Sequence, residues 1–196
     1  MKRLCDIMLA LIVGVLFFPV VMLTAIMVFA SLGLPLIFVQ RRAGQGGEVF
    51  ALYKWRSMSN ATDATGELLP DDMRVTRVGR LVRRLRVDEL PSLLNILAGD
   101  LSFVGPRPLP PTMEINQMFA RARLAVRPGL TGLSQVSGNT LLSNHEKLAV
   151  DIYYIGHHSL IGDFRIVWET LITVLRGERR DEPLIRRALD EMEKMA

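Results

Sequence analysis

Two adjacent carboxylates, Asp88 and Glu89, have the types and spacing that nucleophilic, acid–base or metal-binding chemistry uses. Pro91 suits the first turn of a helix and Gly99 suits its C-terminal cap, so the sequence predicts that the pair lies at a helix N-terminus. Acidic residues are common at such positions because they complement the helix dipole. The pair alone therefore fits a structural role as well as a chemical one.

Basic residues near this pair favour the chemical role. Arg83 precedes Asp88 by little more than one helical turn, and Arg107 stands between two prolines that restrict it. The candidate substrate-binding cations are Lys54, Arg56, Arg83 and Arg107. Such groups bind a diphosphate. They also keep a nearby carboxylate ionised and able to act as a nucleophile.

A carboxylate close to phosphate groups also needs a divalent cation that screens the repulsion between them. Mg²⁺ suits one or two carboxylates together with phosphate oxygens. We therefore expect Mg²⁺ as the cofactor, with Asp88 and Glu89 as its protein ligands. Together these residues favour phosphoryl transfer.

Other kinds of chemistry find little support in the chain. The sequence contains no GxGxxG motif, no P-loop and no recognisable serine or cysteine nucleophile elbow. Its single cysteine, Cys5, excludes an internal disulfide and a cysteine zinc site. The three histidines lack metal-ligand spacing. A formal net charge of +4 suggests an anionic partner, such as a membrane surface, a phosphorylated substrate or a nucleic acid.

The N-terminal segment is strongly apolar, with no charged residue between Ile7 and Val39. It is too long for a signal peptide, whose apolar region is about 7–15 residues. It is long enough for a transmembrane helix, which needs about 20 residues. However, Pro19 interrupts the helix, and both flanks carry basic residues of the kind that stay cytoplasmic.

A re-entrant segment reconciles these features, with a kinked transmembrane helix as the remaining alternative. The chain would enter the bilayer, turn near Phe18 and Pro19, and return to the same face. As a helix, the arm from Ile7 to Phe18 would be about 18 Å long, at about 1.5 Å per residue. The hydrocarbon core is about 30 Å thick, so this arm is too short to cross it.

The rest of the chain alternates short strands with amphipathic helices. A glycine-containing loop precedes a short strand at 49–53, and a mostly polar loop at 59–73 separates this strand from a basic helix at 74–86. We expect this helix at an anionic headgroup surface, with a solvated helix packed on the core as the alternative. Further helices are predicted at 112–126, 145–155 and 163–175, with an extended piece between Gly132 and Gly138. The predicted fold is α+β and mostly helical, with the re-entrant helix pair packed on a small domain. We divide it into a membrane hairpin (1–39), a catalytic domain (40–176) and a charged, partly free tail (177–196).

Four motifs in order resemble those of a known family, the bacterial sugar transferases of the small monotopic phosphoglycosyl transferase type. The motifs are Lys54-Trp55-Arg56-Ser57-Met58, Asp88-Glu89-Leu90-Pro91, the run from Gly99 to Pro108, and Arg127-Pro128-Gly129-Leu130-Thr131-Gly132. The resemblance extends over nearly the whole chain, up to about Leu175. The re-entrant hairpin is also a feature of this family.

The resemblance implies a two-step reaction at the cytoplasmic face of the bacterial inner membrane. Asp88 would attack the β-phosphorus of a UDP-sugar and release UMP. Polyprenyl phosphate, usually undecaprenyl phosphate, would then take the phosphosugar from the aspartate, in the first membrane step of glycan assembly. Glu89 would act either as a neighbour of the magnesium ion or as a base. Asp151 matches another acidic position of the family.

The chain departs from the family pattern in one region. Many members carry Asn-Gly-Arg where this chain has Ser137-Gly138-Asn139, and a downstream tryptophan where this chain has Asn144. An arginine that could contact phosphate or sugar is therefore absent, which leaves the identity of the sugar open.

Other functions remain as alternatives. Glycosyl transfer would release UDP instead of UMP. A non-enzymatic membrane adaptor would explain the basic residues but not Asp88 and Glu89. A nucleic-acid binder would need aromatic side chains interleaved with the basic ones, so we expect no nucleic-acid partner. The sequence leaves the sugar, the pathway and the oligomeric state undetermined.

Overall fold

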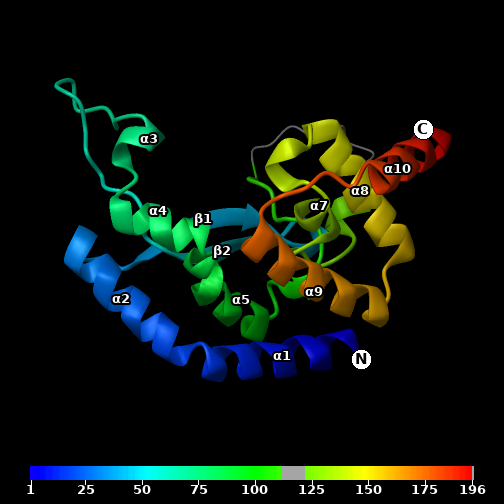
Figure 1. Ribbon diagram of the computed structural model, residues 1–196, viewed down its shortest axis with the longest axis horizontal. Helices are drawn as coiled ribbons and strands as arrows, with labels where there is room; N and C mark the ends of the chain where they lie inside the picture. The colour runs from blue at the N-terminus through cyan, green and yellow to red at the C-terminus, as the bar shows by residue number, and fades with distance from the viewer. Residues whose placement is uncertain (112–121, 196) are drawn as a thin grey trace.

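The computed structural model describes residues 1–111 and 122–195, and helices dominate this part of the chain (Figure 1). The α-helices described in these ranges are α1 (Lys2–Leu16), α2 (Phe18–Leu32), α3 (Asp71–Arg74), α4 (Arg77–Arg84), α5 (Leu93–Ala98), α7 (Leu133–Val136), α8 (Asn144–His157), α9 (Leu160–Arg176) and α10 (Glu182–Met195). Short 3₁₀ turns lie at η1 (Gln45–Gly47), η2 (Val87–Ser92) and η3 (Asn139–Leu141). The predicted mostly helical α+β fold is confirmed.

The strands in the described ranges form two small sheets. Strands β1 (Ile37–Ala43) and β2 (Val49–Trp55) pair antiparallel, with Ile37 opposite Trp55. Strands β3 (Ser102–Val104) and β4 (Gly129–Thr131) pair in parallel. The predicted strand at 49–53 is therefore confirmed and extends by two residues.

The two N-terminal helices meet at a bend of 64°. The break lies at Phe17, slightly before the predicted Phe18 and Pro19, and Pro19 occupies the first turn of α2. A proline has no N–H to donate to the preceding turn, and its ring clashes with the carbonyl four residues earlier. The helix therefore restarts just before Pro19, where the missing N–H costs nothing.

By length and apolarity, none of the described helices meets the requirement for crossing a bilayer alone, although α1 and α2 meet it together. They are less like a closed hairpin than expected, because they form a shallow arc along one side of the domain (Figure 1). Helix α1 packs against α5 and β3, whereas α2 packs against α4 and η2.

Both ends of this helix pair are tied to the same domain. At the N-terminus, Lys2 pairs with Asp163 of α9, and Arg3 donates to two carbonyls of α5 at 2.5 and 2.9 Å. At the other end, Arg56 donates to two carbonyls where α2 ends, each at 3.3 Å. Within the helix, buried Asp6 accepts hydrogen bonds from Ser102 Oγ at 2.9 Å and from the backbone N–H of Phe103 at 3.0 Å.

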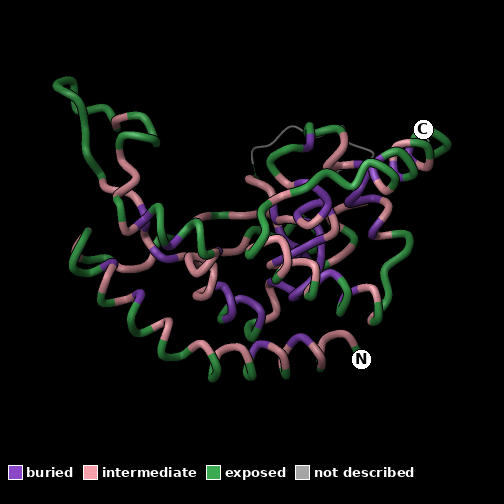
Figure 2. Tube along the Cα trace, in the orientation of Figure 1, coloured by how far each residue is buried: buried purple, intermediate pink, exposed green. Residues whose placement is uncertain are grey.

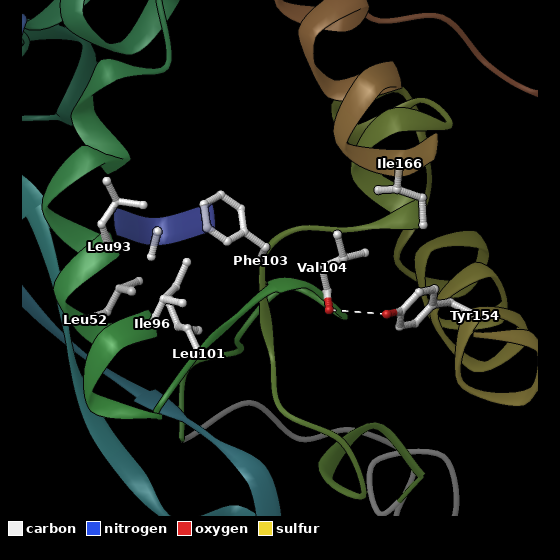
Figure 3. Packing of buried hydrophobic residues seen from close by; sticks show 9 residues of the cluster. Leu52, Leu93, Ile96, Leu101, Phe103, Val104, Tyr154 and Ile166 are labelled. Atoms are coloured by element: carbon white, nitrogen blue, oxygen red, sulfur yellow. Dashed lines mark hydrogen bonds between the residues drawn. The ribbon is translucent and has the colours of Figure 1, made fainter. Parts of the chain in front are cut away.

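One apolar core joins α1 to the domain (Figure 3). Its buried members are Ala10, Leu52, Leu93, Ile96, Leu101, Phe103, Val104, Tyr154 and Ile166. They come from α1, β2, α5, β3, α8 and α9, and the loop before β3. Burying each large side chain stabilises the fold by about 1.5–3 kcal/mol. This core therefore holds α1, β2 and β3 together, whereas buried Val28 of α2 packs in a separate cluster with Trp55 and Val82. Figure 2 shows the buried positions, in purple, mostly within the body of the domain.

Several sequence-based expectations differ from the structure. The piece between Gly132 and Gly138, predicted as extended, contains helix α7. The predicted helix at 74–86 is shorter, because Thr76 caps α4 through a 2.9 Å bond from Gly79 and the helix ends at Arg84. Most of the predicted helix at 112–126 falls in 112–121, outside the described residues.

The charged C-terminal tail is not free of the fold. Helix α10 packs on α8 and buries Ile185, Ala188 and Met192 on one face. These apolar residues recur at helical spacing, which forms an apolar stripe within a charged segment. The helices predicted at 145–155 and 163–175 are confirmed as α8 and α9, each slightly longer.

Candidate active site

All the catalytic and substrate-binding residues predicted from the sequence line one cleft of about 1600 Å³. They are Lys54, Arg56, Arg83, Asp88, Glu89, Arg107 and Asp151. They come from β2 and the residue after it, from α4, η2 and α8, and from the loop after β3, so residues far apart in the sequence meet at this surface. The structure does not give all of them the same surroundings.

A 3₁₀ turn, η2, carries the acidic pair. Asp88 and Glu89 lie in its first turn, and Pro91 lies within it, so the pair precedes α5 by a full turn and is not at the helix N-terminus. Arg86 enters η2 in the left-handed region at φ 57°, a conformation uncommon for a residue with a side chain. Such a backbone persists where the surrounding structure enforces it.

Buried side chains fasten η2 and α5 to strand β2. Ser92 Oγ donates to the carbonyl of Tyr53 at 2.7 Å. Asn95, which is fully buried, accepts from the Tyr53 N–H at 3.1 Å and donates to the Ala51 carbonyl at 2.7 Å. These bonds set β2, which carries Lys54, against the turn that carries Glu89.

Glu89 is held by two cations. Lys54 Nζ lies 2.6 Å from Glu89 Oε1, and Arg107 Nη2 lies 3.1 Å from the same oxygen. Burial alone would raise the pKa of Glu89, but Arg107 and Lys54 outweigh it and hold that pKa below its usual range. Glu89 is therefore a fixed anion that orients Lys54 and Arg107.

Asp88 has the opposite environment. Burial, reinforced by the negative charge of Glu89, raises the pKa of Asp88 to about 6, although Lys54 and Arg86 act against this rise. Its Oδ1 is buried and has no hydrogen-bond partner among the described residues. Asp88 is thus a largely ionised but poorly solvated carboxylate at pH 7, which suits a nucleophile.

The loop that carries Arg107 is fixed by close backbone packing. Gly105 N–H donates to Thr131 O at 2.9 Å, and Gly129 N–H donates to Pro106 O at 2.9 Å. A Cβ at Gly105 would lie 2.5 Å from the carbonyl oxygen of Arg127. The two glycine-containing motifs therefore need their glycines to pack together, and this packing fixes the approach of Arg107 to Glu89.

The remaining predicted residues have other partners. Arg83 Nε donates to Ser57 Oγ at 2.8 Å. Arg56 contacts the carbonyls at the end of α2, so it connects the cleft to the N-terminal helices. Asp151 is buried, accepts from Ser134 Oγ at 2.7 Å and pairs with Arg123 at 2.7 Å, and its burial raises its pKa despite these partners.

The chain matches the family model described as bacterial sugar transferase over residues 1–177. The chain belongs to the bacterial sugar transferase family. It is 39% identical over 181 residues to an uncharacterized sugar transferase, EpsL, of Bacillus subtilis, with 91% of this chain and 89% of the relative covered.

Two further relatives have more specific names. A UDP-glucose:undecaprenyl-phosphate glucose-1-phosphate transferase of Caulobacter vibrioides is 40% identical over 186 residues, with 89% of this chain and 69% of the relative covered. A UDP-N-acetylgalactosamine-undecaprenyl-phosphate N-acetylgalactosaminephosphotransferase of Aeromonas hydrophila is 39% identical over 186 residues, with 90% of this chain covered. The match spans only 44% of the Aeromonas relative.

In this sugar transferase the cleft contains residues that the motifs did not point to. Arg42 of β1 donates to the Pro108 carbonyl at 3.2 Å, and Arg123 donates to the Arg107 carbonyl at 3.0 Å. Arg86 pairs with Glu178 at 3.5 Å. Their partners lie far away in the sequence, so local spacing gave no signal for them.

The described residues contain no cluster of three or more His, Cys, Asp or Glu side chains suited to a metal ion. They do offer the buried, unpartnered oxygen of Asp88, next to Glu89. A magnesium ion that takes most of its ligands from phosphate oxygens and water needs only one or two carboxylates. The acidic pair fits a metal of that kind.

Proposed function

We propose that this chain transfers a phosphosugar from a UDP-sugar to polyprenyl phosphate, such as undecaprenyl phosphate, through a covalent intermediate on Asp88. The observation that carries the proposal is the contrast between two adjacent carboxylates in one basic cleft. Glu89 is neutralised by Lys54 and Arg107, whereas Asp88 has a pKa raised to about 6 and a buried oxygen that finds no hydrogen-bond partner in the part of the chain that the structure describes. The names of the relatives from Caulobacter and Aeromonas support the same substrate classes.

In the first step, an oxygen of Asp88 attacks the β-phosphorus of the UDP-sugar. A phosphorus–oxygen bond forms to the carboxylate, and the bond from the β-phosphorus to the bridging oxygen breaks. UMP leaves with that oxygen and its electron pair. The phosphosugar is then an acyl phosphate on Asp88, a form of nucleophilic catalysis that divides the transfer into two displacements.

In the second step, a phosphate oxygen of the polyprenyl phosphate attacks the same phosphorus. The bond from phosphorus to Asp88 breaks, which regenerates the carboxylate and gives polyprenyl diphosphate-linked sugar. The cleft cations that are not neutralised by Glu89, such as Arg83, suit the phosphate groups of both substrates.

The surroundings of Glu89 favour one of its two candidate roles. A base works best when its pKa lies near the operating pH, but the pKa of Glu89 is held low by Arg107 and Lys54. Glu89 is therefore proposed to orient these cations and to lie beside the metal, and not to remove a proton.

Mg²⁺ is the proposed cofactor. Asp88 and Glu89 would hold it, and it would neutralise charge on the diphosphate. Without Mg²⁺, the carboxylate of Asp88 would have to approach a phosphate whose negative charge the metal does not screen.

The N-terminal helix pair is proposed to enter the inner membrane from the cytoplasmic face and to return to it. Large apolar side chains cover the side of the pair that faces away from the domain, among them Leu11, Val15, Phe18, Leu23 and Ile26. Because both ends of the pair are bonded to one domain, a span would have to separate contacts that the fold keeps together.

Helix α9 supports the same arrangement. Its exposed face carries an apolar stripe at helical spacing, formed by Ile161, Phe164, Trp168, Leu171 and Leu175. Lys2 of α1 pairs with Asp163 in the first turn of α9, so the two helices meet there. An exposed apolar stripe next to a membrane-entering helix suits an interfacial position among lipid headgroups.

Membrane topology can be tested by labelling of introduced cysteines in cells. Lys2→Cys and Gln45→Cys, each in a Cys5→Ser background, should both react only from the cytoplasmic side. Reaction from opposite sides would mean that the segment crosses the bilayer, as in the kinked-span alternative.

Nucleotide release tests the reaction itself. Purified protein in detergent is given Mg²⁺, undecaprenyl phosphate and a panel of UDP-sugars. UMP release with one donor, lost in Asp88→Asn, is the expected result and also identifies the sugar. UDP release would mean glycosyl transfer. Release of no nucleotide with any of the donors would favour the adaptor.

A further inference from the structure

Glu178 lies one residue beyond the segment that matches the family model, in the connection between α9 and α10. Its carboxylate accepts from Asn139 Nδ2 at 2.5 Å and from the N–H of Thr140 at 3.1 Å, and it also binds the Thr140 hydroxyl. It forms an ion pair with Arg86 at 3.5 Å. All four residues line the cleft that contains Asp88.

The connection that carries Glu178 is anchored by the residues that follow it. Arg180 donates to Glu146 at 2.7 Å and to the Leu141 carbonyl at 2.6 Å. The N–H of Asp181 donates to the Ser137 carbonyl at 3.0 Å. Helix α10, with its apolar face buried on α8, follows immediately. The position of Glu178 is therefore fixed by the fold.

Arg86 connects this segment to the acidic pair. It precedes Asp88 by two residues, and its left-handed backbone sets the direction in which η2 begins. Arg86 lines the same cleft as Asp88 and Glu89. Glu89 already binds Lys54 and Arg107, whereas Arg86 pairs with Glu178.

We infer that the segment after α9 completes the active site: Glu178 positions Arg86 at the cleft wall, and Arg86 binds the diphosphate of the donor. This inference rests on the proposed function. A guanidinium held by one carboxylate keeps further N–H donors for phosphate oxygens. Asn139, which stands where many family members have arginine, donates to Glu178 without neutralising it, so the charge of Glu178 remains available to Arg86.

The simplest competing explanation is that Glu178 only closes the connection between α9 and α10. A double-mutant cycle separates the two, because residues that act through each other give non-additive effects. The four proteins are wild type, Glu178→Gln, Arg86→Ala and the double variant. Glutamine keeps an acceptor for Thr140 but removes the charge that holds Arg86.

The cycle has two readouts. The first is the kinetics of UMP release, and the second is calorimetric titration with UDP and Mg²⁺, which needs no turnover. Exposed charges on α10 provide controls, because Glu193→Gln and Arg187→Ala remove the same charge types away from the cleft.

We expect Arg86→Ala to raise the KM for the UDP-sugar and to weaken UDP binding by about tenfold or more, with a smaller change in kcat. Glu178→Gln should do the same by about three- to tenfold. In the Arg86→Ala background, Glu178→Gln should change either quantity by less than about twofold. The two control variants should match wild type.

Additive effects in the cycle would overturn the inference, as would unchanged UDP binding in Arg86→Ala or an absence of UDP binding by wild type. Failure of the proposed function is separate. It would appear as UDP binding that depends on Arg86 and Glu178 without any UMP release.

Discussion

The ammonium of Lys54 lies 2.6 Å from Oε1 of Glu89. Lys54 is therefore paired with Glu89 and not with the adjacent Asp88. Arg107 reaches the same oxygen at 3.1 Å. One carboxylate is thereby stabilised as an anion, while its neighbour, Asp88, has a buried Oδ1 with no hydrogen-bond partner within residues 1–111 and 122–195. The two residues should respond oppositely to neutralisation.

Glu89→Gln should destabilise the protein. Removing one member of a buried ion pair leaves the partner charge uncompensated, which costs about 3–5 kcal/mol in fully buried cases. Since Arg107 is 39% exposed, we expect about 1–3 kcal/mol here. Thermal or urea unfolding in detergent measures the change. Glu193→Gln, on the exposed side of α10, is the matched control and should leave the midpoint unchanged.

Asp88→Asn should abolish UMP release and yet stabilise the protein at neutral pH. The pKa of Asp88 is raised from 3.8 to about 6 in the folded state, so ionised Asp88 opposes folding. The sign follows from linkage, because the folded state binds the Asp88 proton more tightly than the unfolded state does. The protonated carboxyl group therefore contributes its full stabilisation of the fold below pH 4, and this contribution is lost as the pH rises through 6.

The corresponding measurement is the unfolding midpoint of wild type and Asp88→Asn across pH 4–8, in EDTA so that no metal alters the titration. The variant should gain about 1–2 kcal/mol above pH 6.5, and the gain should disappear near pH 4. A variant that is less stable at pH 7 would show that the ionised carboxylate has a partner, which would contradict the proposed environment of the nucleophile.

Arg56→Ala should affect the attachment of α2 more than the binding of the donor. In the structure its guanidinium satisfies carbonyls where α2 ends, although it also lines the cleft. We expect a loss of about 1–2 kcal/mol in stability, with a KM for the UDP-sugar within about twofold of wild type. A tenfold rise in KM at unchanged stability would instead assign Arg56 to the phosphates, as its motif predicted.

Removal of divalent metal should stop UMP release. We expect activity to fall to background with EDTA and to return with excess Mg²⁺, because the proposed metal neutralises the diphosphate that Asp88 must approach. Matched amounts of Ca²⁺ test the requirement for a small octahedral ion and should restore little activity. Full activity in EDTA would remove Mg²⁺ from the proposal and leave the cations of the cleft as the sole source of neutralisation.

The sequence predicted the elements that depend on local pattern. Helices α8 and α9 follow from apolar periodicity, and the break before Pro19 follows from the chemistry of proline. The sequence also predicted which side chains gather in the cleft, because the motifs of the family resemblance carried them. The apolar stripe of α10 was present but was obscured by the surrounding charges.

The remaining features depend on long-range contacts. Arg86 adopts the left-handed conformation although it is not a glycine, so its residue type gave no signal for that backbone. Strands β3 and β4 are too short for a periodic signal, and they pair because Gly105 and Gly129 allow close backbone approach. The opposite environments of Asp88 and Glu89 could likewise not be predicted, because the sequence does not show which of the two pairs with Lys54.

Asp6 should be required for docking of α1 onto the domain. Its buried carboxylate accepts from Ser102 Oγ and from the N–H of Phe103, within a helix whose opposite face is apolar. Asp6→Ala leaves that N–H without a partner, which we expect to cost about 1–3 kcal/mol. Asp6→Asn keeps an acceptor and should cost less. Thermal unfolding in detergent compares them with Cys5→Ala, a neighbouring truncation that removes no hydrogen bond given by the structure. Equal midpoints for Asp6→Ala and Cys5→Ala would mean that apolar packing around Ala10 alone holds α1 in place.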